Sequence, residues 1–125
     1  MLSAVKLLEA HNVYTTAMNV AMKVFELTPH LPHNDPRRIT EEMIYYSSLV
    51  CHNMLDAWQN RTNHPVFMDK LNSASLDAAE TQKRIQAAVD AKYIKPETAL
   101  TISKSYDELI EKISGMLSKP SELVQ

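Results

Sequence analysis

Glycine and cysteine are almost absent from this sequence. The 125 residues include one glycine, Gly115, and one cysteine, Cys51. Nucleotide-binding loops of the Rossmann and P-loop types need several glycines, because their backbone must approach a phosphate closely, so both classes are excluded. A single cysteine also excludes an internal disulfide framework and a multi-cysteine zinc site. Cys51 lies in an apolar stretch, and we interpret it as a small core residue.

An excess of one charge and a long apolar run are also lacking. There are 13 Lys and Arg residues against 15 Asp and Glu residues, a formal net charge of -2. No apolar run approaches the ~20 residues that cross a bilayer, and residues 1–10 lack the apolar core of a signal peptide. We therefore expect a cytoplasmic protein with no membrane partner. The length predicts one domain, residues 1–119, followed by a short tail, residues 120–125.

The sequence is rich in apolar residues at helical spacing, interrupted by proline. We expect helices over residues 3–28, 36–60, 66–93 and 96–119, because apolar positions recur three and four residues apart. Asp35 and Pro36 predict the start of the second helix, as N-cap and first helical residue. The third helix has one strict seam with small residues that permit close packing: Phe67, Leu71, Ala74, Ala78, Thr81, Ile85 and Ala88. The predicted fold is all-α, an up-down-up-down antiparallel four-helix bundle.

The first expected helix carries two apolar stripes, although a bundle core needs only one from each helix. One stripe contains Tyr14, Met18, Met22 and Phe25. The other contains Val13, Ala17, Val20, Val24 and Leu27. Whichever stripe lies outside would form an exposed patch of several hundred Å². We predict that the second stripe faces outward and forms the interface of a homo-oligomer, because a closed ring leaves no copy of such a patch uncovered.

No catalytic or cofactor site is recognisable in the sequence. Di-iron bundles require Glu-x-x-His pairs, and the chain has none. The histidines His30, His33 and His64 lie among Pro and Asn, as solvated loop histidines do. A Gly-x-Ser-x-Gly nucleophile turn is also missing. We expect a non-enzymatic protein without metal, haem or another cofactor.

Two basic pairs are the candidates for contact with nucleic acid. Arg37-Arg38 and Lys83-Arg84 stand out in a chain whose charge is otherwise balanced along its length. Phosphate contacts dominate the affinity of nucleic-acid-binding proteins. A formal net charge of -2 therefore favours a partner other than nucleic acid. An oligomer could still gather one of these pairs into a ring.

Four polar residues inside the expected helices carry a family resemblance. Asn53 and Asp56 lie in the run Asn53–Ala57, and Glu80 and Gln82 lie in the run Glu80-Thr81-Gln82, which is followed by Tyr93-Ile94. These runs, together with Ala10-His11 and Leu27-Thr28 ahead of Leu31-Pro32, resemble the rRNA intervening-sequence proteins and the related accessory variability determinant of diversity-generating retroelements. That family shows a Leu-Glu-Thr-Gln run and a Gly-Tyr-Ile helix exit. Lys92 stands in place of the glycine here.

The resemblance implies a four-helix bundle that assembles into a closed ring, expected to be a pentamer, with no known enzymatic activity. Retroelement relatives are basic and bind nucleic acid and a reverse transcriptase. This chain is slightly acidic, so we favour a homo-oligomeric scaffold or adaptor that binds a protein partner. The alternative is a nucleic-acid-binding accessory of a reverse transcriptase or an RNA-processing system.

Overall fold

Four long helices make up the protein in a computed structural model that describes the backbone of residues 4–118 and the side chains of residues 11–118. The helices are α1 (Ala4–Leu27), α2 (Ile39–Gln59), α3 (His64–Asp90) and α4 (Pro96–Ser118), and a short 3₁₀ turn, η1 (Thr28–His30), follows α1. The described residues contain no strand. The all-α prediction is confirmed, and the expected tail at residues 120–125 lies outside the described residues.

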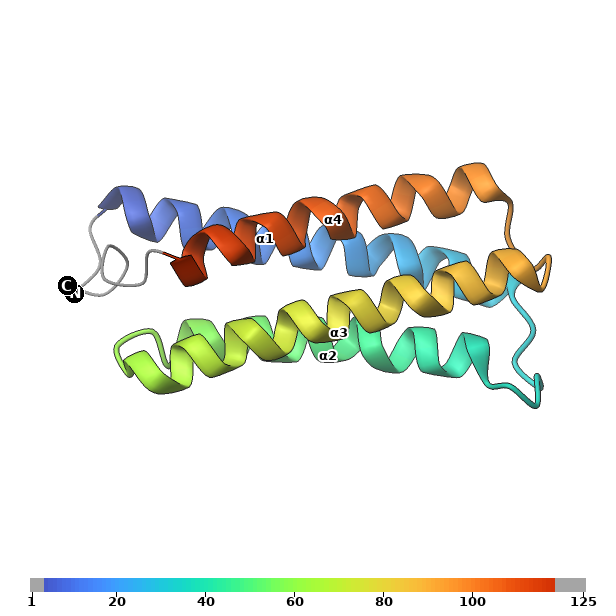
Figure 1. Ribbon diagram of the computed structural model, residues 1–125, viewed down its shortest axis with the longest axis horizontal. Coiled ribbons are helices and arrows are strands. Elements are labelled where there is room, and N and C mark those ends of the chain that lie inside the picture. Colours follow the sequence, from blue (N-terminus) through green and yellow to red (C-terminus); the bar gives the residue numbers. More distant parts are fainter. Residues whose placement is uncertain (1–3, 119–125) are drawn as a thin grey trace.

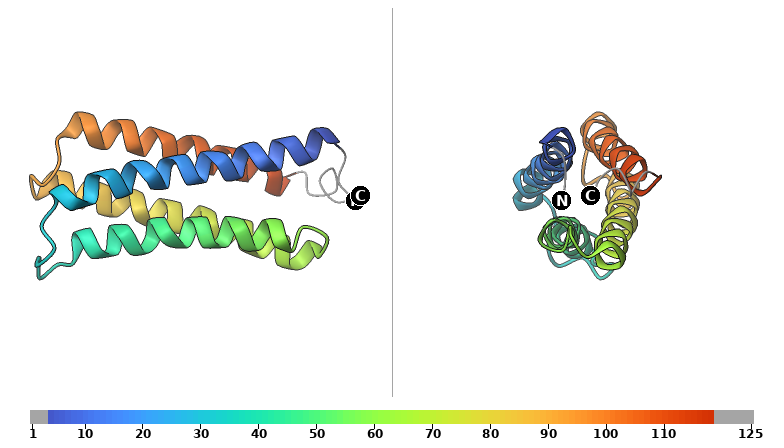
Figure 2. Two further views of the ribbon diagram at one scale, coloured as in Figure 1. Left: turned by 180° about the vertical axis from the view of Figure 1, so that it is seen from behind. Right: turned by 90° about the vertical axis from the view of Figure 1, so that its left-hand side faces the viewer.

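The helices run up and down in chain order and form a square in cross-section (Figures 1 and 2). In this square α1 packs between α2 and α4, and α3 packs between the same two helices on the other side. The contact between α2 and α3 is the most extensive of the four. The predicted antiparallel four-helix bundle is therefore confirmed.

The core seams of α3 and α4 are those that the spacing predicts. All seven α3 seam residues, from Phe67 to Ala88, are buried. The buried residues of α4 also repeat at intervals of three and four: Ala99, Ile102, Tyr106, Leu109, Ile113 and Met116. Ala74 and Ala78 are completely buried, and their small side chains permit the close approach of α2 to α3.

The start of α2 differs from the prediction. The Asp35 carboxylate accepts a hydrogen bond from the Arg37 backbone N–H at 2.9 Å, which closes a local turn before the helix. Arg38 then adopts a left-handed conformation, with φ at 56°, and α2 begins at Ile39. The Asp35-Pro36 pair therefore forms a turn, and the helix starts three residues after the predicted first position, Pro36.

The end of α3 forms a Schellman motif. The backbone N–H of Tyr93 donates to the Ala88 carbonyl at 2.8 Å, and that of Lys92 donates to the Val89 carbonyl at 2.9 Å. This arrangement requires a left-handed residue after the helix, and Lys92 takes that conformation with φ at 64°. Lys92 is the position at which the resemblance implies a glycine, and glycine adopts this left-handed conformation most readily.

Candidate interaction surfaces

The polar residues Asn53 and Asp56 tie α2 to α3. The Asn53 side-chain amide donates to the Asp77 carboxylate at 2.7 Å, and Lys70 forms an ion pair with Asp56 at 3.7 Å. Burial is the main cause that raises the pKa of Asp77, and the Asn53 hydrogen bond opposes it. Both residues therefore serve the packing of two neighbouring helices in this structure.

Gln82 ties α3 to α4 in the same way. Its side-chain amide donates to the Asp107 carboxylate at 2.7 Å and to the Ser103 backbone carbonyl at 3.0 Å. A polar residue that pairs across two helices fixes their axial register. The Gln82 hydrogen bonds therefore hold α3 and α4 at one axial offset.

Glu80, the fourth motif residue, belongs to a cluster of charges between α2 and α3. Arg84 pairs with Glu80 and with Glu42, the latter at 3.5 Å, and its guanidinium lies over the Tyr46 ring, 4.6 Å from the ring centre. Lys83 also pairs with Glu80, at 3.0 Å. The Lys83 and Arg84 hydrogen bonds lower the pKa of the Glu80 carboxyl. The carboxylates in this cluster offset both cations.

The other basic pair is offset by carboxylates too. Arg37 pairs with Asp35 at 3.4 Å, and Arg38 pairs with Glu41 at 2.8 Å. The Asp35 side chain is 3% exposed and also accepts a hydrogen bond from the Tyr93 hydroxyl at 2.8 Å. The Arg37 backbone N–H, followed by the Tyr93 hydroxyl, lowers the pKa of Asp35.

Three of the four predicted nucleic-acid contacts share one depression. Arg37, Lys83 and Arg84 line a shallow hollow of about 410 Å³ on the α2–α3 side, together with Glu42 and Asp90. Arg38 lies at a neighbouring hollow instead. The fold brings Arg37 close to the Lys83-Arg84 pair and places Glu42 and Asp90 among them, so the hollow has mixed charge.

The predicted interface stripe of α1 lies in the core, which corrects that assignment. Val13, Ala17, Val20 and Val24 are at most 4% exposed within a single chain, and Leu27 is half-buried. The other stripe faces outward: Met18 is 37% exposed, Met22 54% and Phe25 43%, and Tyr14 is half-buried. The buried stripe has the shorter side chains, Ala and Val, and the outward stripe has the longer Met and Phe side chains.

We call Met18, Met22 and Phe25 the α1 ridge. The three residues lie three and four apart and so share one face of the helix. Thr16 and Lys23, whose side chains contact α4, lie about 150° around α1 from the ridge at 3.6 residues per turn. The ridge therefore points away from α4, on the outer side of the α1–α2 pair.

The buried polar groups of the core do not assemble a reactive site. The Tyr106 hydroxyl and the Thr40 hydroxyl are buried without a hydrogen-bond partner among the described residues. Burial strongly raises the pKa of Tyr106 and also raises that of the Cys51 thiol, so both groups stay neutral. The described part of the chain contains no cluster of three or more His, Cys, Asp or Glu side chains placed to hold a metal ion.

The hydrogen bond between the Tyr93 hydroxyl and the Asp35 carboxylate was not predicted from the sequence. It joins the connection before α2 to the turn after α3, 58 residues apart. The only signal for it was the tyrosine of the helix-exit motif. The partner of Tyr93 depends on which segments between helices meet at one end of the bundle, and the sequence alone does not show this.

Comparison with protein families gives a match over nearly the whole chain. The profile of the 23S rRNA-intervening sequence protein family matches residues 9–115. The chain belongs to this family. A comparison with curated proteins gave no match. None of the described helices of this intervening-sequence protein has the length and apolar character needed to cross a membrane.

A solved structure shares the fold of this intervening-sequence protein. It is a protein of unknown function from the S23 ribosomal protein family of Bacteroides thetaiotaomicron. The TM-score is 0.79 at 18% sequence identity, and the match covers 89% of this chain and 99% of that chain. At this identity the likeness shows the fold alone. Neither the description of the family nor that of this neighbour names an enzymatic activity.

Proposed function

We propose that the chain is a non-enzymatic, cytoplasmic scaffold that assembles with copies of itself through α1 and binds a protein partner. The observation that carries the proposal is the α1 ridge, whose three apolar side chains are 37%, 54% and 43% exposed. Side chains of this size leave about 300 Å² of apolar surface in one patch, in the range that often has a binding role. A pentameric ring is the assembly that the family resemblance implies.

The charge distribution supports a protein partner over nucleic acid. Arg37, Arg38, Lys83 and Arg84 each form an ion pair with a carboxylate of the same chain. A phosphate would have to compete with these carboxylates for every cation. Binding energy for nucleic acid comes mainly from neutralised phosphates, so an offset cluster provides little of it.

The experiment for self-association is light scattering coupled to size exclusion at micromolar concentration. We expect the wild-type protein to elute as a multiple of the 14.2 kDa chain mass. Met22→Glu places a charge on the ridge and is expected to lower the mass to that of one chain while the helix content stays the same. Leu76→Glu is the matched control, because Leu76 is 60% exposed on α3 and away from the ridge. A wild-type mass of 14.2 kDa would refute the proposal.

A nucleic-acid accessory remains the second candidate, favoured by the grouping of Arg37, Lys83 and Arg84 in one hollow. Its test is the fluorescence anisotropy of a labelled RNA at low salt. Binding by the wild type that weakens at least tenfold in Lys83→Glu would support this second candidate. The scaffold proposal predicts no difference between the two proteins.

A further inference from the structure

Arginine and tyrosine gather on one side of the bundle. The chain has four arginines and five tyrosines, and three of each line the outer side of α2 and α3 or contact a residue there. We define the α2–α3 face as Lys83 together with these six residues: Arg37, Arg38, Tyr45, Tyr46, Arg84 and Tyr93. Tyrosine and arginine are two of the residues that dominate the binding energy of protein interfaces. The composition of the α2–α3 face is therefore typical of a protein-binding surface.

Two shallow hollows adjoin on this face. One has a volume of about 410 Å³ and is lined by Lys83 and Arg84, among others. The other has a volume of about 280 Å³ and is lined by Arg38 and Tyr45, among others. Glu42 lines both hollows, so they meet at this residue. A small molecule needs a site that buries most of its surface, whereas two open, adjoining hollows suit a segment of a partner chain.

The Arg84 guanidinium is held in place and keeps a donor for a partner. It lies over the Tyr46 ring, 4.6 Å from the ring centre. Its Nε atom pairs with Glu42 at 3.5 Å, and its Nη1 atom pairs with Glu80. Its Nη2 atom has no partner among the side chains of residues 11–118. Arg84 can therefore bind a further carboxylate without releasing those that it already holds.

Arg37, in the same hollow, is held in a similar way. Its Nε atom pairs with Asp35 at 3.4 Å, and its Nη2 atom donates to the Tyr93 hydroxyl at 3.3 Å. Its Nη1 atom has no partner within the described part of the chain. A guanidinium has five N–H donors in a fixed planar geometry, so one that is already held loses little side-chain entropy when it binds a carboxylate.

The cation is more exposed than its carboxylate partner in three of the ion pairs on this face. The Arg37 side chain is 63% exposed, whereas the Asp35 side chain is 3% exposed. The Lys83 side chain is 69% exposed, whereas the Glu80 side chain is 33% exposed. A partner that approaches the face therefore meets cations first. The complementary group is a carboxylate or another anion.

The mixed charge of the larger hollow favours a protein over a nucleic acid. Three cations and the carboxylates of Glu42 and Asp90 line it, so the net charge of its lining is one positive. A nucleic acid carries a phosphate at every nucleotide and would bring several of them against these carboxylates. A protein segment can place a single carboxylate among the cations and neutral side chains beside Glu42 and Asp90.

Tyr45 provides an apolar anchor beside these charges. It is 58% exposed, although its ring contacts the Tyr46 ring edge to face, with ring centres 5.1 Å apart. An aromatic ring that is supported on one side and exposed on the other can bury an apolar side chain of a partner.

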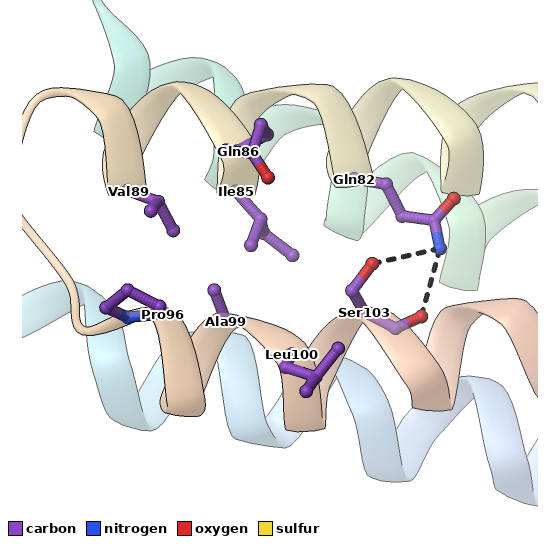
Figure 3. A pocket seen from close by; sticks show the side chains of 8 residues that line it. All are labelled: Gln82, Ile85, Gln86, Val89, Pro96, Ala99, Leu100 and Ser103. Atoms are coloured by element: carbon purple, nitrogen blue, oxygen red, sulfur yellow. Dashed lines mark hydrogen bonds between the residues drawn. The ribbon is translucent and has the colours of Figure 1, made fainter.

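The groove between α3 and α4 lacks these properties (Figure 3). Ile85 and Val89 point from α3 toward Ala99 on α4, and Gln82 closes one end through its hydrogen bonds to Ser103. None of the residues that line this groove is charged. It therefore offers nothing to a carboxylate, and the α2–α3 face is the better site for an acidic partner.

We propose that the α2–α3 face binds an acidic segment of a protein partner. A carboxylate of this segment lies between Lys83 and Arg84, and an apolar side chain of the segment packs against Tyr45. This inference rests on the protein partner of the proposed function and gives that partner a site and a chemistry.

The test begins with selection from a displayed library of short random peptides, with the wild-type protein as bait. We expect the enriched peptides to combine Asp or Glu with a large apolar residue. Enrichment of Lys or Arg in place of acidic residues would overturn the inference, and so would the absence of any enrichment.

The affinity of the most enriched peptide is then measured by fluorescence anisotropy. We expect Lys83→Glu and Tyr45→Ala each to weaken binding at least tenfold. Leu76→Ala is the matched control for Tyr45→Ala, because Leu76 is 60% exposed and lines neither hollow. Lys104→Glu is the matched control for Lys83→Glu, because Lys104 is an exposed cation on α4. Both controls should bind as the wild type does, and circular dichroism checks that all four variants keep their helix content.

Three outcomes separate this inference from the proposals on which it depends. If the peptide binds the wild type, Lys83→Glu and Tyr45→Ala equally well, the α2–α3 face is not its site, while a protein partner stands. If a labelled single-stranded RNA binds more tightly than the peptide and loses affinity in Lys83→Glu, the face belongs to the nucleic-acid candidate and the inference is overturned. A wild-type mass of one chain in light scattering refutes self-association and leaves this inference in place.

Discussion

Replacing Lys92 by glycine is expected to stabilise the protein. Lys92 is the left-handed residue of the Schellman motif, with φ at 64°. A side chain at such a position costs roughly 1–2 kcal/mol, because Cβ approaches the following carbonyl oxygen. Glycine avoids that cost, but its greater conformational freedom in the unfolded chain offsets about 0.4–1 kcal/mol of the gain. The net gain is about 0.5–1 kcal/mol, which corresponds to a Tm increase of roughly 2–4 °C for a chain of this length.

Two controls separate this cause from a general effect of the mutation. Lys92→Ala removes the side chain beyond Cβ and keeps the left-handed cost, so its Tm should equal that of the wild type. Lys104→Gly makes the same exchange at an exposed position inside α4, where it should cost about 1 kcal/mol. The assay is thermal and urea unfolding followed by circular dichroism, at matched protein concentrations. A Lys92→Gly protein with a Tm at or below the wild-type value would refute the reasoning.

Three further perturbations test other parts of the structure. Ile85→Asp buries an unpaired carboxylate on the α3 seam at a cost of several kcal/mol, so we expect loss of the cooperative unfolding transition, whereas Gln86→Asp on the exposed side should unfold normally. Tyr106→Phe removes a buried hydroxyl that has no hydrogen-bond partner among the side chains of residues 11–118, so we expect an unchanged or higher free energy of unfolding in urea; a fall of more than about 1 kcal/mol would mean that the hydroxyl is hydrogen-bonded. Asp35→Asn should lower the Tm at pH 7, and the difference from the wild type should fade below about pH 4. The pKa of Asp35 is lower in the folded protein than in the unfolded chain. Its contribution to stability is therefore present above the unfolded pKa and is lost as the pH falls through the folded pKa.

The seams of α3 and α4 could be predicted residue by residue, because each helix has one apolar stripe at intervals of three and four. The stripes of α1 could not be assigned, since both have the same period. The structure shows that the Val and Ala stripe is the buried one. In α2, Tyr46 is half-buried beneath Arg84, and the polar Ser47 takes a core position because its hydroxyl donates to the Ile44 carbonyl at 3.0 Å.

In each polar contact between helices, one of the two residues could be recognised from the sequence and its partner could not. The sequence marks Asn53 and Gln82 as polar residues in helices, but it does not name Asp77 or Asp107 as their partners. Which residue on a neighbouring helix becomes the partner depends on the axial offset of the two helices. The spacing of apolar residues along one helix does not show this offset.

The unequal contacts among the helices predict an order of folding. The α2 and α3 helices share the most extensive contact and are separated only by the residues between Gln59 and His64, so closing this hairpin costs little chain entropy. In contrast, α1 must find α4 from the far end of the sequence, and the side-chain links between them, from Lys23 and Lys112, are exposed or only partly buried. Its amides should therefore exchange with solvent hydrogen before those of α2 and α3. A copy with α1 detached exposes the Val and Ala stripe, so brief opening of this helix is the route by which two copies could exchange α1.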